Sequence, residues 1–382
     1  MKPVRVLLAT FPVASHLFPM VPLGLAFAAA GHEVLVASLP GFVPVIESTG
    51  LTGLGVGKEP DFGRVWADDT IAPLDGAPGD EAARLRAARA VQMFCQVGAD
   101  MAADLVPWAR ANPVDLVVYE PRAYAGVLAA AATGVPAVRH LWGVDQTYGR
   151  WSFERSAVAA MFDQQGHPEV DPHGVLTLDP CPPSMQTRTP SARLGVRFVP
   201  YNGDGVVPDG LRAPGDRPRI CVTWGSTVAR QLGHLDPARE VVRAGSQLDA
   251  EVLVCTSEEQ VPLFGPLPPD VRLLSGSPPL REILPGCAVV AHPGGAGTLL
   301  TAAALGVPQL VVPAVGDQFL NAEQYAMTGA GLACSSSDPL RPALTRLLSD
   351  PARRTAARAL AEEIAVQPAP SQLVERLLNF PF

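Results

Sequence analysis

Short apolar runs alternate with longer Ala-rich or amphipathic stretches along most of the chain. In the first half, strands are predicted at residues 4–11, 32–38, 115–120 and 136–142. Helical composition marks residues 81–111 and 124–133. In the second half, strands are predicted at residues 219–224, 251–256, 271–274, 287–291 and 308–312, and terminal helices over 338–380. Because strands that alternate with helices build βαβ units, the pattern predicts an α/β fold with parallel sheets.

The alternation stops once, between residues 200 and 219, where Gly, Pro and Asp dominate. This break predicts two Rossmann-like domains, residues 1–208 and 209–382, that face each other across a crevice. The last helix is expected to pack back on the N-terminal domain. In such sheets, ligands bind outside the carboxyl ends of the strands.

Two stretches with few charged residues are candidate membrane segments. Residues 6–32 contain no Asp, Glu, Lys or Arg, and residues 283–316 contain no Asp or Glu. Prolines or glycines interrupt both stretches, which favours buried strands joined to helices over a signal peptide or a membrane span. We therefore expect no membrane association.

Composition and net charge limit the classes of partner that we expect for this protein. The chain has 382 residues, of which 48% are hydrophobic, and a formal net charge of −8. The apolar fraction suffices for two cores, whereas the negative charge argues against nucleic acid or anionic lipid as a partner. Six cysteines without a CxxC pair predict reduced thiols and a cytoplasmic protein.

The most informative motif is His292-Pro-Gly-Gly-Ala-Gly-Thr298, between a predicted strand and an Ala-rich helix. Glycines allow close approach of the backbone, and a helix N-terminus offers free N–H groups, so a phosphate or diphosphate is the expected ligand. No Gly-Lys-Ser/Thr follows, which excludes a Walker A loop. A dinucleotide site stays open because Asp317 lies where a ribose-binding acid could stand, as does a strand–helix turn without a ligand.

Polar side chains follow two other strands of the second half. Asp317 and Gln318 can hydrogen-bond to sugar hydroxyls, although Asp317 is an equally good helix N-cap. The hydroxyls of Ser226 and Thr227 can cap a helix or reach a phosphate. These residues extend the expected anion site.

The first half offers candidates for proton transfer. His16 lies in the loop after the first strand, where an imidazole can act as a general base, and Glu120 ends another strand at the same sheet edge. The carboxylate could orient the imidazole or be a solvated strand end. His140 and Asp145 are further candidates at a strand end.

Metal-dependent chemistry has little support in the sequence. The segment His167-Pro-Glu-Val-Asp-Pro-His173 alternates potential ligands, but its prolines favour a solvated loop. No Asp-x-Asp occurs in the chain. We therefore expect no metal site.

Together these segments resemble one family. They are residues 11–19, Arg139-His-Leu-Trp-Gly-Val-Asp145, Arg197-Phe-Val-Pro-Tyr-Asn-Gly203, residues 292–298, Gly306-Val-Pro-Gln-Leu-Val-Val-Pro313 and Asp317-Gln318. The chain is similar throughout to inverting GT-B glycosyltransferases, in particular the actinobacterial enzymes that attach deoxysugars to polyketide and other antibiotic aglycones. The resemblance implies transfer of a hexose from a nucleotide diphosphate sugar, typically dTDP-linked, to a hydrophobic natural product.

The resemblance also implies roles for individual residues. His16 is the catalytic base, Glu120 supports it, and Asp145 could share the role. Residues expected to bind the nucleotide sugar are Ser226, Thr227, Pro278, Leu280, His292, Gly294, Gly295, Ala296, Gly297, Thr298, Asp317 and Gln318. Phe11 and Trp142 are expected to contact the acceptor. No cofactor and no metal are implied, and a homodimer or a helper protein stays open.

The sequence departs from the family pattern at three places. Pro293 replaces a second His, Val315-Gly316 replaces a Trp before the Asp-Gln pair, and Glu120 replaces a shorter Asp. Two other functions remain as alternatives: an NAD(P)-dependent oxidoreductase and a non-catalytic helper protein on the same fold. An intact His16 with Asp317-Gln318 argues against the helper.

Overall fold

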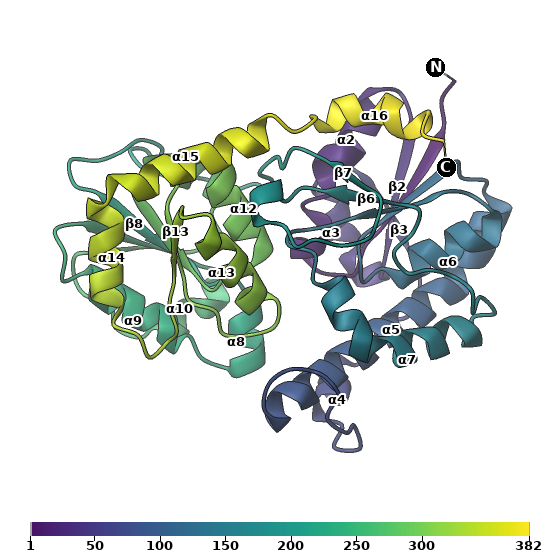
Figure 1. The fold of residues 1–382 in the computed structure, drawn as a ribbon, viewed down its shortest axis with the longest axis horizontal. Coiled ribbons are helices and arrows are strands. Elements are labelled where there is room, and N and C mark those ends of the chain that lie inside the picture. The colour runs from purple at the N-terminus through teal and green to yellow at the C-terminus, as the bar shows by residue number, and fades with distance from the viewer. Residues whose placement is uncertain (1, 382) are drawn as a thin grey trace. The chain divides into compact units, whose positions relative to one another are not determined.

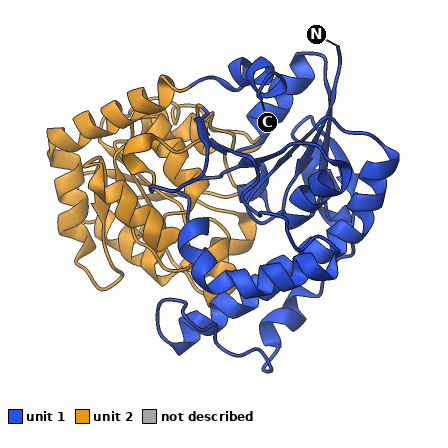
Figure 2. Cartoon of the chain, turned by 45° about the vertical axis from the view of Figure 1, so that its right-hand side comes forward, with its two compact units in different colours: residues 1–179, 188–196, 368–382 blue, residues 180–187, 197–367 orange. Residues whose placement is uncertain are grey.

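The computed structural model describes residues 2–381, which form two compact units. Figure 2 shows unit 1, made of residues through 179, 188–196 and 368 onward, and unit 2, made of 180–187 and 197–367. This division assigns residues 197–208 to unit 2 and the final helix to unit 1.

Unit 1, whose strands β2, β3, β6 and β7 are labelled in Figure 1, is built on a parallel sheet. The sheet has seven strands in the order β3-β2-β1-β4-β5-β6-β7. Its strands are β1 (Arg5–Ala9), β2 (Glu33–Ser38), β3 (Thr52–Gly55), β4 (Leu116–Tyr119), β5 (Ala137–His140), β6 (Leu176–Asp179) and β7 (Arg193–Gly195). Its helices are α1 (Ala14–Leu17), α2 (Val21–Ala29), η1 (Pro40–Phe42), α3 (Val43–Glu47), α4 (Phe62–Ala67), α5 (Glu81–Ala111), α6 (Tyr124–Thr133), α7 (Thr147–Gln164) and α16 (Pro370–Leu378).

Unit 2 is built on a six-stranded parallel sheet with the order β10-β9-β8-β11-β12-β13. Its strands are β8 (Arg219–Val222), β9 (Glu251–Cys255), β10 (Val271–Leu274), β11 (Val289–His292), β12 (Gln309–Val311) and β13 (Gly331–Ala333). Its helices are η2 (Pro183–Met185), α8 (Thr227–Leu232), α9 (Asp236–Gly245), η3 (Glu258–Gln260), α10 (Val261–Phe264), α11 (Leu280–Ile283), η4 (Leu284–Gly286), α12 (Ala296–Ala304), α13 (Gln318–Met327), α14 (Leu340–Ser349) and α15 (Pro351–Ala365). The prediction of two Rossmann-like parallel sheets is thus confirmed.

Local sequence accounts for the predicted elements. The central strands β1, β4, β8 and β11 are almost entirely buried, as their continuous apolar runs require. Helix α5 starts on Asp80, whose carboxylate accepts a hydrogen bond from the Ala83 N–H, an N-cap that satisfies a free backbone donor.

Four strands were not predicted: β3, β6, β7 and β13. Three of them contain glycine, which has a low β-propensity, and all are only three or four residues long. They form because an established neighbouring strand supplies the hydrogen-bonding edge.

Each sheet has a point where the strand order reverses direction. In unit 1 this switch point lies between β1 and β4, and in unit 2 it lies between β8 and β11. Loops leaving neighbouring strands there run in opposite directions, which opens a crevice for ligands at the carboxyl edge of the sheet. The candidate residues of each unit lie near the switch point of that unit's own sheet.

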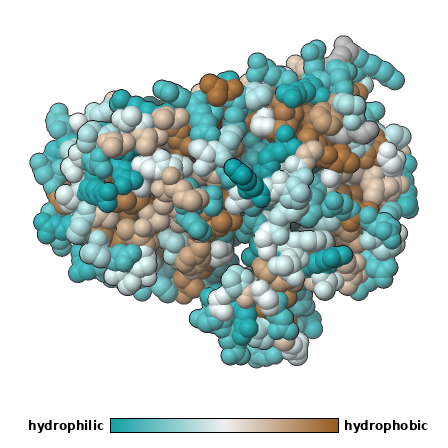
Figure 3. Space-filling model, viewed as in Figure 1, coloured by the Kyte–Doolittle hydropathy of each residue, from teal (hydrophilic) through white to brown (hydrophobic). Residues whose placement is uncertain are grey.

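The thiols, the helices and the surface complete the description of the two units. All six cysteines are free, and no helix within residues 2–381 is both long and apolar enough to cross a membrane. On the face drawn in Figure 3, hydrophilic and hydrophobic residues are mixed. Large apolar side chains that are exposed are Leu25, Val175, Val199, Val206, Phe319, Met327 and Val366.

Candidate active site

His16 and Glu120 meet at the switch point of unit 1. His16, which was predicted to lie in a loop, lies in the short helix α1 after β1, and Glu120 directly follows β4. The His16 Nδ1 atom lies 3.2 Å from Glu120 Oε2 without forming a hydrogen bond to it. The contact is therefore an electrostatic one, in which Nδ1 faces the carboxylate.

The Glu120 carboxylate is buried and held by the main chain. Its side chain has no exposed surface, Oε1 accepts the Phe11 N–H at 2.8 Å, and Oε2 accepts the Arg122 N–H at 2.8 Å. These two backbone donors fix the orientation of the carboxylate. Glu120 is thus anchored although it is one methylene longer than Asp.

A buried ion cluster supports the loop that carries Glu120. The Arg122 guanidinium donates to both carboxylate oxygens of Glu154 in α7, at 2.6 and 3.2 Å, and to the Tyr124 hydroxyl at 3.1 Å. Arg150 also donates to Glu154. Sequence reasoning missed this cluster because its members are separated along the chain and form no motif.

Aromatic side chains surround His16. The Trp142 ring stacks on the His16 imidazole with centroids 4.2 Å apart and planes tilted by 16°, and Phe11 lies 5.9 Å away. Phe11 and Trp142 are only 4% and 7% exposed. Phe62 and Phe94, both half-buried and in edge contact with Phe11, were not predicted and offer more accessible apolar surface.

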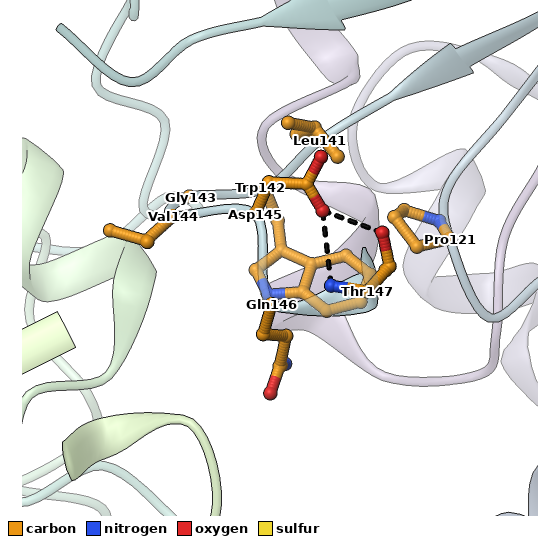
Figure 4. Close-up of a pocket in the computed structure, with 8 residues that line it drawn as sticks. All are labelled: Pro121, Leu141, Trp142, Gly143, Val144, Asp145, Gln146 and Thr147. Carbon is orange, nitrogen blue, oxygen red and sulfur yellow. Dashed lines mark hydrogen bonds between the residues drawn. The ribbon is translucent and has the colours of Figure 1, made fainter. Parts of the chain in front are cut away.

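Asp145 belongs to the loop that presents Trp142. Residues 141–147 and Pro121 line a shallow depression, in which Figure 4 shows the Asp145 carboxylate bonded to the N–H and hydroxyl of Thr147. Arg139 and Arg193 each donate to Asp145 Oδ2 at 3.0 Å. Both carboxylate oxygens therefore have strong donors, an arrangement that suits an anchor of the loop better than a proton acceptor.

His140 is equally enclosed. Its Nδ1 lies 2.7 Å from the Leu141 carbonyl oxygen, and burial lowers the pKa of His140 to about 4. The ring is therefore neutral at physiological pH, which suits packing within the sheet.

In unit 2, the glycine turn joins β11 to α12 at the switch point. Gly294 has a φ of +96°, and a Cβ there would lie 3.0 Å from the Gln318 carbonyl oxygen, so only glycine fits. A Cβ on Gly295 would meet nothing within 4 Å, so open space lies beside the turn. The first intrahelical bond runs from the Leu299 N–H to the Gly295 carbonyl. The N–H groups of Ala296, Gly297 and Thr298 precede it and are suited to hold an anion.

His292 contributes through the backbone rather than as a cation. It has no exposed surface, its Nδ1 accepts the Gly294 N–H at 3.0 Å, and its Nε2 lies 2.7 Å from Gln309 Oε1. Burial lowers the pKa of His292 to about 4, so the ring is neutral with its proton on Nε2. Both ring nitrogens are engaged within unit 2, and the imidazole orients the turn instead of supplying charge.

The Asp317-Gln318 pair begins helix α13. Gln318 is 4% exposed, and its side-chain oxygen accepts the N–H groups of Ala314 and Val315, both at 3.0 Å. It thereby folds the loop after β12. Asp317 is half-buried and makes no side-chain cap, so of the two it is the more accessible to a sugar.

Of the four remaining residues that were predicted to bind the nucleotide, two are exposed and two are buried. Ser226 and Thr227 are exposed at the start of α8, after the other switch-point strand, and Arg230 donates to the Ser226 hydroxyl. Pro278 and Leu280 are buried below an exposed rim at residues 275–277.

Asn202, which was not predicted, supports this loop. Its Oδ1 accepts the Arg281 N–H at 3.0 Å, and its Nδ2 donates to the Thr301 hydroxyl at 3.1 Å. It therefore connects the segment 197–208 to α11 and α12.

Known proteins resemble this chain over nearly its whole length. The N-terminal domain model of the family described as erythromycin biosynthesis protein CIII-like matches residues 25–225, and its C-terminal domain model matches residues 239–380. The chain belongs to this family of glycosyltransferases.

Individual relatives agree with this assignment. L-demethylnoviosyl transferase of Streptomyces niveus is 37% identical, with 98% of this chain and 97% of that protein aligned. Among solved structures, glycosyltransferase VinC in complex with dTDP is 34% identical with a TM-score of 0.80, and 98% of each chain is covered. Spinosyn rhamnosyltransferase SpnG complexed with spinosyn aglycone is 32% identical with a TM-score of 0.83, covering 98% and 100%. The GT-B fold and the glycosyltransferase activity follow, and the oxidoreductase alternative is set aside.

The segment 167–173 has a structural explanation in this glycosyltransferase. Asp171 Oδ1 lies 2.8 Å from His173 Nδ1, and the His173 ring stacks on Tyr148 with centroids 4.1 Å apart. Within residues 2–381, no group of three His, Cys, Asp or Glu side chains could hold a metal ion.

Proposed function

We propose that this glycosyltransferase moves a deoxyhexose from a dTDP-linked donor to a hydrophobic natural-product aglycone, with inversion and without a metal ion. The pairing of His16 with the buried Glu120 carboxylate at 3.2 Å carries the proposal. A base oriented in this way suits deprotonation of an acceptor hydroxyl.

The reaction is a single displacement. His16 Nε2 takes the proton of the acceptor hydroxyl while the acceptor oxygen forms a bond to the anomeric carbon. The bond from that carbon to the diphosphate oxygen breaks, and its electron pair leaves with the diphosphate. Glu120 stabilises the imidazolium that forms, and attack opposite the leaving group inverts the anomeric configuration.

Neutral donors serve the leaving diphosphate. The N–H groups of Ala296, Gly297 and Thr298 and the positive end of α12 are fixed before the reaction, so they stabilise developing charge without reorganisation. Ser226 and Thr227, at the neighbouring strand end, are suited to complete this site. Pro278 and Leu280 are proposed to contact the base.

The substrates are inferred from the relatives. VinC is described in complex with dTDP, SpnG with a spinosyn aglycone, and the Streptomyces niveus relative as an L-demethylnoviosyl transferase. The aromatic residues around His16, Phe11 and Trp142 with the half-buried Phe62 and Phe94, suit an apolar acceptor. Six free thiols favour a reducing cytoplasm as the location.

Titration of the full chain with dTDP in EDTA tests the donor and the metal independence together. We expect binding that is unchanged when Mg²⁺ is restored. Incubation with a panel of dTDP-sugars and aromatic or macrolide acceptors, read by mass spectrometry and by NMR of the anomeric proton, tests the reaction. Loss of dTDP binding on chelation, or a product that retains the donor configuration, would contradict the proposal.

A further inference from the structure

Asn321 in α13 touches the two segments that were predicted to bind the donor. Its Nδ2 atom donates to the Gly294 carbonyl oxygen at 2.9 Å and to Asp317 Oδ2 at 3.1 Å. Asn321 is 2% exposed and therefore lies behind the site. The side chain bridges the diphosphate turn and the Asp317 carboxylate from the protein side.

We propose that Asn321 is a positioning residue of the donor site, which sets the conformation of the Gly294 turn and the orientation of Asp317 together. This inference rests on the proposed function, because it assigns the diphosphate to the turn and the sugar to Asp317. Asn321 is buried behind the site, so it acts through these two residues and not on the substrate.

The amide group suits this task for a geometric reason. A carboxamide nitrogen carries two hydrogens in one plane, so it can donate one to each of two acceptors. Both acceptors here are oxygens, one from a backbone carbonyl and one from a carboxyl group. No single-donor side chain of similar size can satisfy both.

The turn has little freedom to adapt if this support is lost. Gly294 is also held by its N–H bond to His292, and it packs against Val311 and the Gln318 backbone. Rotation of the Gly294 peptide would reorient the first N–H groups of α12, which are proposed to hold the diphosphate. A change at Asn321 is thereby transmitted to two different parts of the donor.

Three variants of the full chain separate donation from packing. Asn321→Asp keeps the size of the side chain but removes both donors and places a second carboxylate beside Asp317. Asn321→Ser keeps a single donor. Gln324→Ala, on the same helix, removes an amide for which no role is inferred and serves as the matched control. Isothermal titration with dTDP and with dTDP-glucose gives the affinities, and thermal melting verifies folding.

We expect Asn321→Ser to weaken dTDP binding about tenfold and Asn321→Asp by more, with Gln324→Ala unchanged, since each lost bond to a charged or oriented partner affects affinity by this order. Asp317→Asn combined with Asn321→Asp should recover part of the loss for dTDP-glucose, because the new amide can donate to the new carboxylate. The recovery distinguishes an oriented hydrogen bond from general damage to the fold.

The outcomes are distinct from those for the proposed function. Wild-type protein that binds no dTDP would remove the proposed function and this inference with it. Wild-type binding together with Asn321→Asp affinities equal to those of Gln324→Ala would overturn the inference alone. A double variant no better than Asn321→Asp would overturn the link to Asp317. Melting of Asn321→Asp below the assay temperature shifts the test to Asn321→Ser, whose unchanged affinity would equally overturn it.

Discussion

The two units share a strand order but build their sites in opposite ways. In unit 1, the residues behind the site are buried charges: Glu120, Arg122 and Glu154 behind His16, and Asp145 with its arginines beside Trp142. In unit 2, the supports are mostly neutral amides and imidazole, namely His292 with Gln309, and Gln318 and Asn321. The switch point is the same, and the supporting chemistry differs.

The difference follows from what each site is proposed to handle. A base that becomes an imidazolium needs a nearby anion, and an anion in the interior needs donors and a rigid loop around it. An incoming diphosphate brings its own negative charge, so fixed neutral dipoles are sufficient and a buried anion would repel it. One fold thus supports proton transfer with charges and leaving-group binding with dipoles.

Gly295→Val should have the largest effect on ligand binding. The substitution fills the open space beside the turn, where the diphosphate is proposed to lie, while the φ of −60° is accessible to valine. We expect dTDP binding to be undetectable by calorimetry, with stability reduced by only about 1 kcal/mol.

Gly149→Val provides the matched control in unit 1, since a Cβ there also meets nothing within 4 Å. It should bind dTDP like wild type. Normal dTDP affinity in Gly295→Val would mean that the turn is not the diphosphate site.

His16→Ala should separate catalysis from donor binding. Loss of a general base typically lowers kcat by about 10²–10⁴-fold, whereas dTDP affinity should stay unchanged because the proposed nucleotide site lies in unit 2. His234→Ala, which removes an exposed histidine of unit 2, should leave both quantities unchanged. A His16→Ala enzyme with wild-type turnover on an aliphatic alcohol would refute the assignment.

Glu120→Gln should have a smaller effect on turnover, about 10- to 100-fold. The amide keeps the shape but loses the charge that stabilises the imidazolium. Its NH2 group must also face the backbone N–H of Phe11 or Arg122, where two donors oppose each other. Steady-state kinetics should show a lower kcat with unchanged dTDP affinity. The surface variant Glu258→Gln is the control, and a fall in dTDP affinity for Glu120→Gln alone would contradict the separation of roles.

Acidification should destabilise the ligand-free protein because the buried His292 ring becomes protonated more readily in the unfolded state. Burial holds the pKa of His292 at about 4 in the folded state, against about 6.5 when unfolded, so the folded state binds fewer protons. The contribution of His292 to the free energy of unfolding is fully present above pH 6.5. It is lost as the pH falls toward 4, by roughly 3 kcal/mol. Urea unfolding between pH 4.5 and 7 should show a shallower pH dependence for His292→Asn than for wild type, and identical slopes would contradict the neutral state of this histidine.

Predictions from the sequence succeeded where a signal was local. The 31-residue helix 81–111 and the helix 124–133 are observed with the predicted limits. Their amphipathic or Ala-rich composition is a property of the segment itself, and helix-breaking residues flank it directly. The short edge strands β3, β7 and β13 were missed because pairing with a neighbour, not their own composition, makes them strands. The same reason explains why Arg122, Glu154, Asn202 and Asn321 were not singled out.

The sequence alone determined that the chain forms two parallel α/β units, that a glycine turn precedes α12, that His16 follows the first strand, and that Glu120 ends another strand. Only the tertiary structure decided which strand ends become neighbours and which side chains orient the site. Glu120 accepts the N–H of Phe11, 109 positions away, because β1 and β4 are paired in the sheet. The tertiary structure also showed that the His292 ring is neutral and that the Gln318 side chain folds back on its own loop. Composition and periodicity report short-range preferences, whereas the orientation of a buried polar group depends on partners that only sheet register and packing bring within hydrogen-bond distance.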